Sequence, residues 1–272
     1  VWRLGLRQGR WKYIAAAESG HGQLFDLASD PGERRDVAGA QPDRLHELQR
    51  LWLIEAVKYN VLPIDDRGGE RLNPDIAGRP SLIHGTSQLL FPGMGRLSES
   101  SVVNVKNKSF SVTAELDIPE TRVHGTIVAQ GGRFGGWGLY AMDGKVKFLY
   151  NVLGIQSFVT EADRELPAGQ HQVRMEFAYD GGGLAKGGGV TLYYDGELVG
   201  TGRVGATQAM IFSGDETTDV GYEAGTPVSS EYTTQDSRFT GKIAWVQIDL
   251  GDDDHDHLID PEERLRVAMA RQ

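Results

Sequence analysis

The second half of the chain alternates apolar and polar positions with a period of two. Over 109–117 every second residue is apolar, and the same alternation returns over 173–179. Such alternation predicts strands with one buried and one polar face. Asp143-Gly144 and Asp195-Gly196 lie between apolar runs, where two-residue hairpin turns need positive φ. Repeated short strands joined by such turns predict an antiparallel β-sandwich over 96–250.

The first part of the chain follows another pattern. Two short extended segments, 2–14 and 23–27, flank a small polar turn and predict a hairpin. Asp30-Pro31-Gly32-Glu33 combines a cap acceptor, an early proline and a carboxylate, which predicts a helical turn. From Pro42 onward apolar residues recur at helical spacing, and they predict one amphipathic helix that ends before Pro63. These apolar residues are Leu45, Leu48, Trp52, Ala56 and Tyr59.

The domain boundary is expected between these two patterns. Residues 62–95 are rich in Pro, Gly, Asp and Arg without sustained periodicity, which is typical of a linker. At the other end, Asp260-Pro261-Glu262-Glu263 repeats the cap pattern and predicts a last helix. The predicted fold is therefore α+β: a hairpin-plus-helix subdomain at 1–61, a linker at 62–95, the sandwich at 96–250, and an acidic turn with a C-terminal helix at 251–272.

Charge and composition exclude several kinds of site and partner. The chain of 272 residues contains no Cys, which excludes disulfides, thiolate zinc sites and cysteine nucleophiles. Its net charge of −10 and the lack of a basic run argue against nucleic acid as a partner. No apolar stretch approaches the ~20 residues of a membrane helix, so we expect no membrane partner. None of these features assigns a cellular location.

Three phrases follow one another near the start of the chain: Gly9-Arg10-Trp11-Lys12-Tyr13, Leu24-Phe25-Asp26-Leu27 and Asp30-Pro31-Gly32-Glu33. In order and spacing they resemble the terminal hairpin in the C-terminal portion of bacterial type I arylsulfatases. Further phrases are similar to the long bacterial members that carry an extra C-terminal β-domain: residues 55–63, residues 179–188, Phe239 to Ile243, and Asp260-Pro261-Glu262.

The resemblance implies that the catalytic machinery lies elsewhere. Sulfatases use a formylglycine, made from Cys or Ser in a C/S-x-P-x-R motif, together with calcium, and both belong to an N-terminal catalytic domain. The nearest serine here, Ser29, is followed at the fifth motif position by Glu33, where the motif requires Arg. We therefore expect a segment without catalytic, cofactor or metal residues of its own, whose partner is that catalytic domain. Because the chain opens at Val1 with a dense apolar stretch, we treat it as a fragment whose Trp2, Leu4, Leu6 and Trp11 form an exposed apolar face.

Other candidate sites have plainer explanations. Gly131 to Gly136 resembles a phosphate-binding loop, but a strand follows where a helix is required, which favours a turn. The cluster Asp252 to His257 could hold a cation, although it lacks the glycine and distal Glu of an EF-hand, and a solvated acidic turn is the alternative. His84, His124 and His171 are isolated and are expected to be packing or surface residues.

One predicted hairpin of the sandwich consists of a strand over 190–194, the Asp195-Gly196 turn and a return strand through Leu198 and Val199. Through this hairpin the sandwich resembles the laminin-G or concanavalin-like class. Five aromatic side chains could form a platform for sugar rings if they shared one face: Trp137, Tyr140, Tyr150, Tyr193 and Tyr194. Two functions therefore remain open. The chain is either the non-catalytic C-terminal segment of an arylsulfatase or a lectin-like module for a carbohydrate or sulfated ligand.

Overall fold

The chain forms two compact units, Val1–Arg71 and Leu72–Gln272. The computed structural model describes residues 3–16, 21–64, 67–251, 257–260 and 262. Each unit has a hydrophobic core of its own, and each is described here by itself. The division falls inside the short 3-10 helix η1 (Gly69–Leu72).

The first unit is a three-stranded antiparallel sheet with one helix. Its strands β1 (Arg3–Gln8), β2 (Trp11–Ala16) and β3 (Gly22–Asp26) are paired in chain order. The helix α1 (Pro42–Lys58) begins and ends where the apolar spacing predicts. Tyr13, Ala15, Leu24 and Leu48 form the buried core. A three-stranded sheet with a helix thus stands where a hairpin-plus-helix subdomain is predicted over 1–61.

Two local predictions for this unit are wrong. The extended segment over 2–14 is itself a hairpin, because Gly9 adopts a φ of 60° and turns the chain between β1 and β2. The predicted helical turn at Asp30 is a non-helical loop. Glu33 has a φ of 55°, which is outside the helical region, and the Asp30 carboxylate accepts from the backbone N–H groups of Arg34 and Arg35.

The expected apolar face of this unit is also different. Leu6 and Trp11 pack against the core of the unit itself. Trp2 lies outside the described residues. The exposed apolar side chains are instead on α1, where Leu53, Ile54 and Val57 are each more than half exposed.

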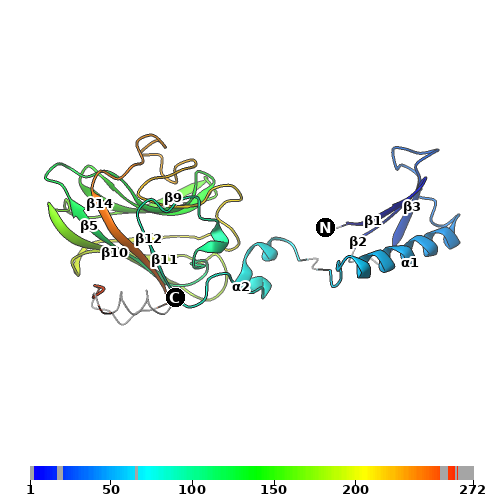
Figure 1. The fold of residues 1–272 in the computed structure, drawn as a ribbon, viewed down its shortest axis with the longest axis horizontal. Coiled ribbons are helices and arrows are strands. Elements are labelled where there is room, and N and C mark those ends of the chain that lie inside the picture. Colours follow the sequence, from blue (N-terminus) through cyan, green and yellow to red (C-terminus); the bar gives the residue numbers. More distant parts are fainter. Residues whose placement is uncertain (1–2, 17–20, 65–66, 252–256, 261, 263–272) are drawn as a thin grey trace. The chain divides into compact units, whose positions relative to one another are not determined.

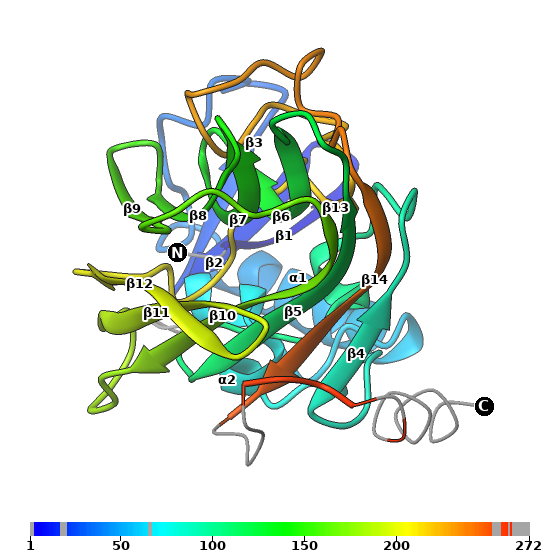
Figure 2. The ribbon, with the colours of Figure 1, turned by 90° about the vertical axis from the view of Figure 1, so that its left-hand side faces the viewer.

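The second unit is a sandwich of two antiparallel sheets (Figures 1 and 2). The six-stranded sheet has the order β12-β11-β10-β5-β14-β4, and in Figure 2 β14 runs between β5 and β4. Its strands are β4 (Ser87–Leu90), β5 (Phe110–Ile118), β10 (Gly169–Tyr179), β11 (Gly188–Tyr194), β12 (Glu197–Val204) and β14 (Lys242–Leu250). The five-stranded sheet has the order β13-β6-β7-β8-β9, from β6 (Gly125–Gly132), β7 (Gly135–Met142), β8 (Lys145–Val152), β9 (Gln156–Glu161) and β13 (Thr218–Val220). The prediction of an antiparallel sandwich is confirmed.

Apolar side chains from both sheets fill the space between them. Phe110 of β5 meets Trp137 of β7 with ring centroids 5.6 Å apart. Trp137 is fully buried, and its Nε1–H donates to Gln130 Oε1 at 3.0 Å. The one polar atom of this large side chain thus has a partner, as a buried indole requires.

The predicted turns join neighbouring strands. Asp143 and Gly144 have φ values of 51° and 81°, and Asp195 and Gly196 have φ values of 50° and 81°. Both residues of each turn are thus left-handed, the conformation that favours Asp-Gly in two-residue hairpins. Residues 133–134 likewise form the turn between β6 and β7, as expected for the glycine-rich stretch.

The segment expected to be a linker, 62–95, contributes to the sandwich. Its strand β4 pairs with β14, from Leu90 opposite Val246 to Ser87 opposite Asp249. The same segment contains the short helix α2 (Pro74–Ala77), and η2 (Glu99–Ser101) follows β4. Four residues of strand are too few to produce a recognisable alternation in the sequence.

The C-terminal segment is described only at 257–260 and 262. The buried Ile259 exchanges hydrogen bonds with the side chain of Gln172 on β10, at 3.0 and 2.8 Å. Most of the predicted last helix lies outside the described residues, as does Asp252 to Asp256 of the acidic cluster. Among the described helices, none is long and apolar enough to cross a membrane.

Candidate functional site

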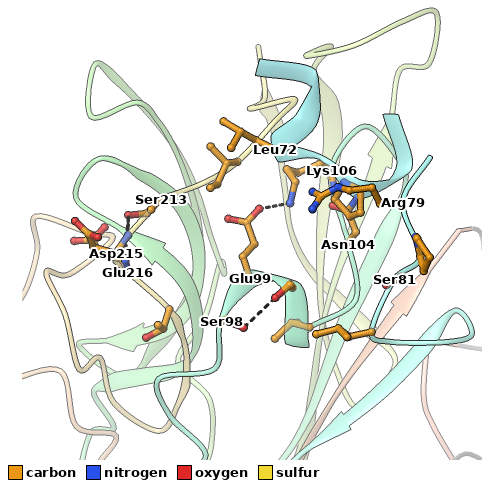
Figure 3. Close-up of a pocket in the computed structure, with 18 residues that line it drawn as sticks. Leu72, Arg79, Ser81, Ser98, Glu99, Asn104, Lys106, Ser213, Asp215 and Glu216 are labelled. Carbon is orange, nitrogen blue, oxygen red and sulfur yellow. Dashed lines mark hydrogen bonds and ion pairs between the residues drawn. The ribbon is translucent and has the colours of Figure 1, made fainter. Parts of the chain in front are cut away.

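A hollow of about 510 Å³ opens in the sandwich unit, where three segments distant in sequence meet. One wall comes from residues 72–82, the second from 98–106, and the third from the 211–217 loop (Figure 3). The volume is within the range of small-molecule sites, which is about 300–1,000 Å³.

The middle of this pocket is a buried ion pair. Lys106 is 4% exposed, and its ammonium group bonds to Glu99 Oε1. Burial lowers the pKa of Lys106, while the neighbouring Glu99 carboxylate opposes that effect. The second Glu99 oxygen accepts from the backbone N–H of Phe212 at 3.0 Å, and the Phe212 ring lies 4.8 Å from Lys106 Nζ. With both oxygens engaged, Glu99 holds the pocket wall together and is poorly placed to act as a general base.

The wall formed by 72–82 is held on the sandwich by Asn73. This side chain is 1% exposed and donates to the carbonyl of Ala209 at 2.7 Å. Its Oδ1 accepts from Asn104 Nδ2 at 3.0 Å and from the backbone N–H of Asp75 at 3.1 Å, and the latter bond caps α2. The wall that carries Arg79 is therefore fixed in place.

The 211–217 loop supplies the acidic wall. Ser213 Oγ accepts from the backbone N–H groups of Asp215 and Glu216 at 3.3 and 3.1 Å. Burial raises the pKa of Glu216, whose carboxylate accepts from Thr226 Oγ1. Asp215 is exposed. In Figure 3 Ser213, Asp215 and Glu216 lie on the side of the pocket opposite Arg79.

The pocket thus presents acceptors on one wall and donors on the other. Asp215 offers carboxylate oxygens, whereas Arg79, on the opposite wall, carries guanidinium N–H donors. Leu72 and Leu82, at its edge, are 52% and 72% exposed and add apolar surface. Among the described residues, no group of three or more His, Asp or Glu side chains could hold a metal ion. The arrangement suits the binding of an uncharged or dipolar, hydrogen-bonding ligand.

The aromatic platform expected from the sequence does not form. Trp137, Tyr150 and Tyr194 are buried in the core between the sheets. Tyr140 is buried in a second cluster, outside that core, and Tyr193 stacks on His257 with ring centroids 4.0 Å apart. The five rings share no face, because the alternation of a strand sends neighbouring side chains to opposite sides of the sheet.

The other residues singled out in the sequence either lie on the surface or contact neighbouring side chains. His84 and His124 are exposed, and His171 Nδ1 lies 2.6 Å from Asp195 Oδ2, so the prediction of packing or surface histidines is confirmed. Ser29 bonds to Asp26 within a turn. His257, the described member of the acidic cluster, bonds to Glu176 at 2.7 Å.

Sequence reasoning missed the residues of the pocket. Arg79 lies in the segment predicted to be a linker, and Glu99, Lys106 and Asp215 stand among ordinary polar residues. Their convergence depends on tertiary contacts such as the bond from Asn73 to Ala209, which spans 136 positions. No local pattern in the sequence signals that contact.

Comparison with known proteins shows similarity to other sandwich domains. No family model matches the chain. The Ruminococcus gnavus IT-sialidase CBM40 bound to alpha2,3 sialyllactose is 13% identical over 69% of this chain and 99% of its own length, with a TM-score of 0.40. Mouse laminin alpha1 chain domains LG4-5 are 15% identical, over 62% of this chain and 40% of their own length, with a TM-score of 0.36. The LG1-3 region of the laminin alpha2 chain is 13% identical, over 61% of this chain and 31% of its own length, with a TM-score of 0.39. We infer no function from these likenesses.

Proposed function

We propose that the sandwich unit is a carbohydrate-binding module and that its ligand occupies the pocket of Figure 3. The supporting observation is the placement of hydrogen-bond acceptors opposite donors around one hollow of about 510 Å³. A sugar hydroxyl both donates and accepts, so a polyol satisfies both walls at once. The exposed Leu72 and Leu82 match the apolar C–H surfaces of a sugar ring.

The test uses the full chain on an array of neutral, carboxylated and sulfated oligosaccharides, with each hit measured by titration calorimetry. We expect saturable binding that weakens about tenfold or more in Asp215→Asn, because the charged acceptor is lost while the shape is kept. Arg79→Gln removes a donor from the opposite wall and should also weaken binding. The matched control is Glu197→Gln, an exposed carboxylate outside the pocket.

The proposal fails if no oligosaccharide on the array binds. It also fails if binding is saturable but unchanged in both pocket variants, since the ligand would then lie elsewhere.

For the first unit we propose a second role, as the closing subdomain of an arylsulfatase whose catalytic domain lies outside this chain. The resemblance of Trp11-Lys12-Tyr13 and Asp30-Pro31-Gly32-Glu33 suggests it, and the exposed Leu53, Ile54 and Val57 on α1 favour it. A catalytic domain would cover this apolar strip. We expect a dye that reports exposed apolar surface to bind this strip, and Ile54→Glu to reduce the dye binding. We also expect the purified chain to release no sulfate from an arylsulfate. Sulfate release by the chain, or no dye binding, would contradict this role.

A further inference from the structure

A second hollow, of about 520 Å³, lies on the outer side of the five-stranded sheet. It is bounded by the hairpin tips at Arg133 and Gly154 and by the loop at 227–235. The hydroxyl and amide groups of Ser157, Ser230 and Gln235 contribute to its lining. It shares no lining residue with the pocket of Figure 3.

The loop that covers this side of the sheet is firmly held. Val228 and Tyr232 pack with Tyr140 in a small apolar cluster, and the rings of Tyr140 and Tyr232 meet edge to face with centroids 5.2 Å apart. Beneath them the buried Glu223 accepts from Tyr232 Oη, from Thr126 Oγ1 and, at 2.8 Å, from the backbone N–H of Val228. The hollow is therefore preformed.

The backbone of Arg133 is fixed from two sides. The amide of Asn151, which is 4% exposed, donates to the carbonyls of Gly132 and Arg133, both at 3.0 Å. The N–H of Arg133 donates to Thr226 Oγ1 at 3.1 Å. A side chain at Gly154 would come within 2.8 Å of the Arg133 carbonyl, which shows how closely the two hairpin tips approach.

The guanidinium group of Arg133 forms no ion pair with a carboxylate among the described residues, whereas Arg10, Arg122, Arg164 and Arg203 each form one. The nearby Glu216 carboxylate lies at the backbone of Arg133. Arg133 is exposed at the rim of the hollow. A planar fork of N–H donors on a rigid support suits two oxygens of one carboxylate or sulfate.

Exposed apolar side chains stand on the same two hairpin tips, next in sequence to Arg133 and Gly154. Phe134, Leu153 and Ile155 are 66%, 57% and 84% exposed, and they stand on the two hairpin tips that meet at Gly154. Leu153 has a φ of 55°, a conformation that costs free energy in a residue other than glycine and is retained where the surroundings impose it. The two tips thus carry an aromatic ring and aliphatic surface next in sequence to Arg133.

We propose that this hollow is a second binding site, selective for acidic saccharides, in which Arg133 holds a carboxylate or sulfate group and Phe134 contacts the face of the sugar ring. The hydroxyl and amide groups of the hollow take the remaining sugar hydroxyls. The saccharide nature of the ligand rests on the proposed carbohydrate-binding function, whereas the anionic selectivity rests on Arg133 alone.

The experiment titrates the full chain with three versions of one oligosaccharide: neutral, carboxylated and sulfated. We expect the acidic versions to bind more tightly, with an affinity that falls as NaCl rises. Arg133→Gln should weaken binding of the acidic versions roughly tenfold or more and abolish the salt dependence, and Arg133→Lys should recover only part of it. Phe134→Ala should weaken all versions that use this site.

The controls separate this site from the pocket of Figure 3. Arg122→Gln removes another exposed arginine, one that pairs with Glu165 away from the hollow, and should change nothing. If Asp215→Asn weakens binding but Arg133→Gln does not, carbohydrate binding stands and the second site is overturned. If no version binds, both proposals fall. Equally tight binding of an oligoglutamate peptide at Arg133 would overturn the assignment to saccharides.

Discussion

Glu223 is a carboxyl group held away from water between the five-stranded sheet and the loop above it. Its side chain is 3% exposed, and burial raises its pKa to about 7, although bonds from Tyr232, Val228 and Thr126 oppose the rise. The folded protein therefore keeps this proton at pH values where the unfolded chain, with a pKa near 4.5, has released it. Stability falls as pH rises through that window.

The expected size of this effect can be measured with one substitution. A shift from 4.5 to about 7 corresponds to roughly 3 kcal/mol of stability that is present below pH 4.5 and lost by about pH 7. Glu223→Gln cannot ionise, so its Tm should fall less between pH 5 and pH 8 than that of the wild type. Thermal unfolding followed by circular dichroism at both pH values checks this.

The control for Glu223 is Glu197→Gln, which changes an exposed carboxylate. It should reproduce the pH dependence of the wild type. If the Tm of Glu223→Gln depends on pH as that of the wild type does, ionisation of Glu223 costs the folded state no stability. The loop at 227–235 would then be held in another way.

Some strands and turns can be predicted from their own residues, whereas others depend on contacts with residues elsewhere in the chain. The strand β5 shows its alternation over nine residues, and the Asp-Gly turns show the residues that positive φ requires, so both could be predicted. The strand β4 has four residues and depends on the side chain of Gln88, which donates to the carbonyl of Ser101 at 3.0 Å and accepts from the N–H of Val103 at 2.9 Å. Contacts of this kind have no local signature.

The contribution of Gln88 gives a test of whether β4 belongs to the sandwich. Gln88→Leu keeps the volume but leaves two backbone groups without partners in a buried place, which should cost about 1–3 kcal/mol. Chemical denaturation of the full chain measures the loss. Leu89→Thr, on the neighbouring and more exposed position of β4, should change the free energy of unfolding by about 0.5 kcal/mol or less.

An unchanged stability in Gln88→Leu would mean that 87–90 detaches at little cost. The segment would then behave as the linker that its composition predicts. A loss of stability in Gln88→Leu but not in Leu89→Thr would show that the sandwich already includes β4.

The residues of the two hollows likewise show the difference between local sequence signals and features that arise only in the folded chain. Arg133 stands in a glycine-rich turn that the sequence does predict, yet whether its guanidinium group forms an ion pair within the described part of the chain depends on the folded surface.

At the scale of the whole molecule, the main cores of the two units differ greatly in size. Among the described residues, the core of the first unit contains four buried residues, Leu48 among them, and the main core of the second unit joins the two sheets of the sandwich. Because the buried fraction of a domain rises with its size, the unit Val1–Arg71 should be the less stable of the two. We expect calorimetry of the full chain to resolve two transitions.

Matched substitutions can assign those transitions. Leu48 of α1 and Leu139 of β7 are both fully buried, and each Leu→Ala change should cost about 2–5 kcal/mol in its own core. Leu48→Ala should lower only the first transition, and Leu139→Ala only the second, because sites that share no packing partners do not couple. A single transition that shifts equally in both variants would show that the units unfold together, and the first unit would then need no further domain to stabilise it.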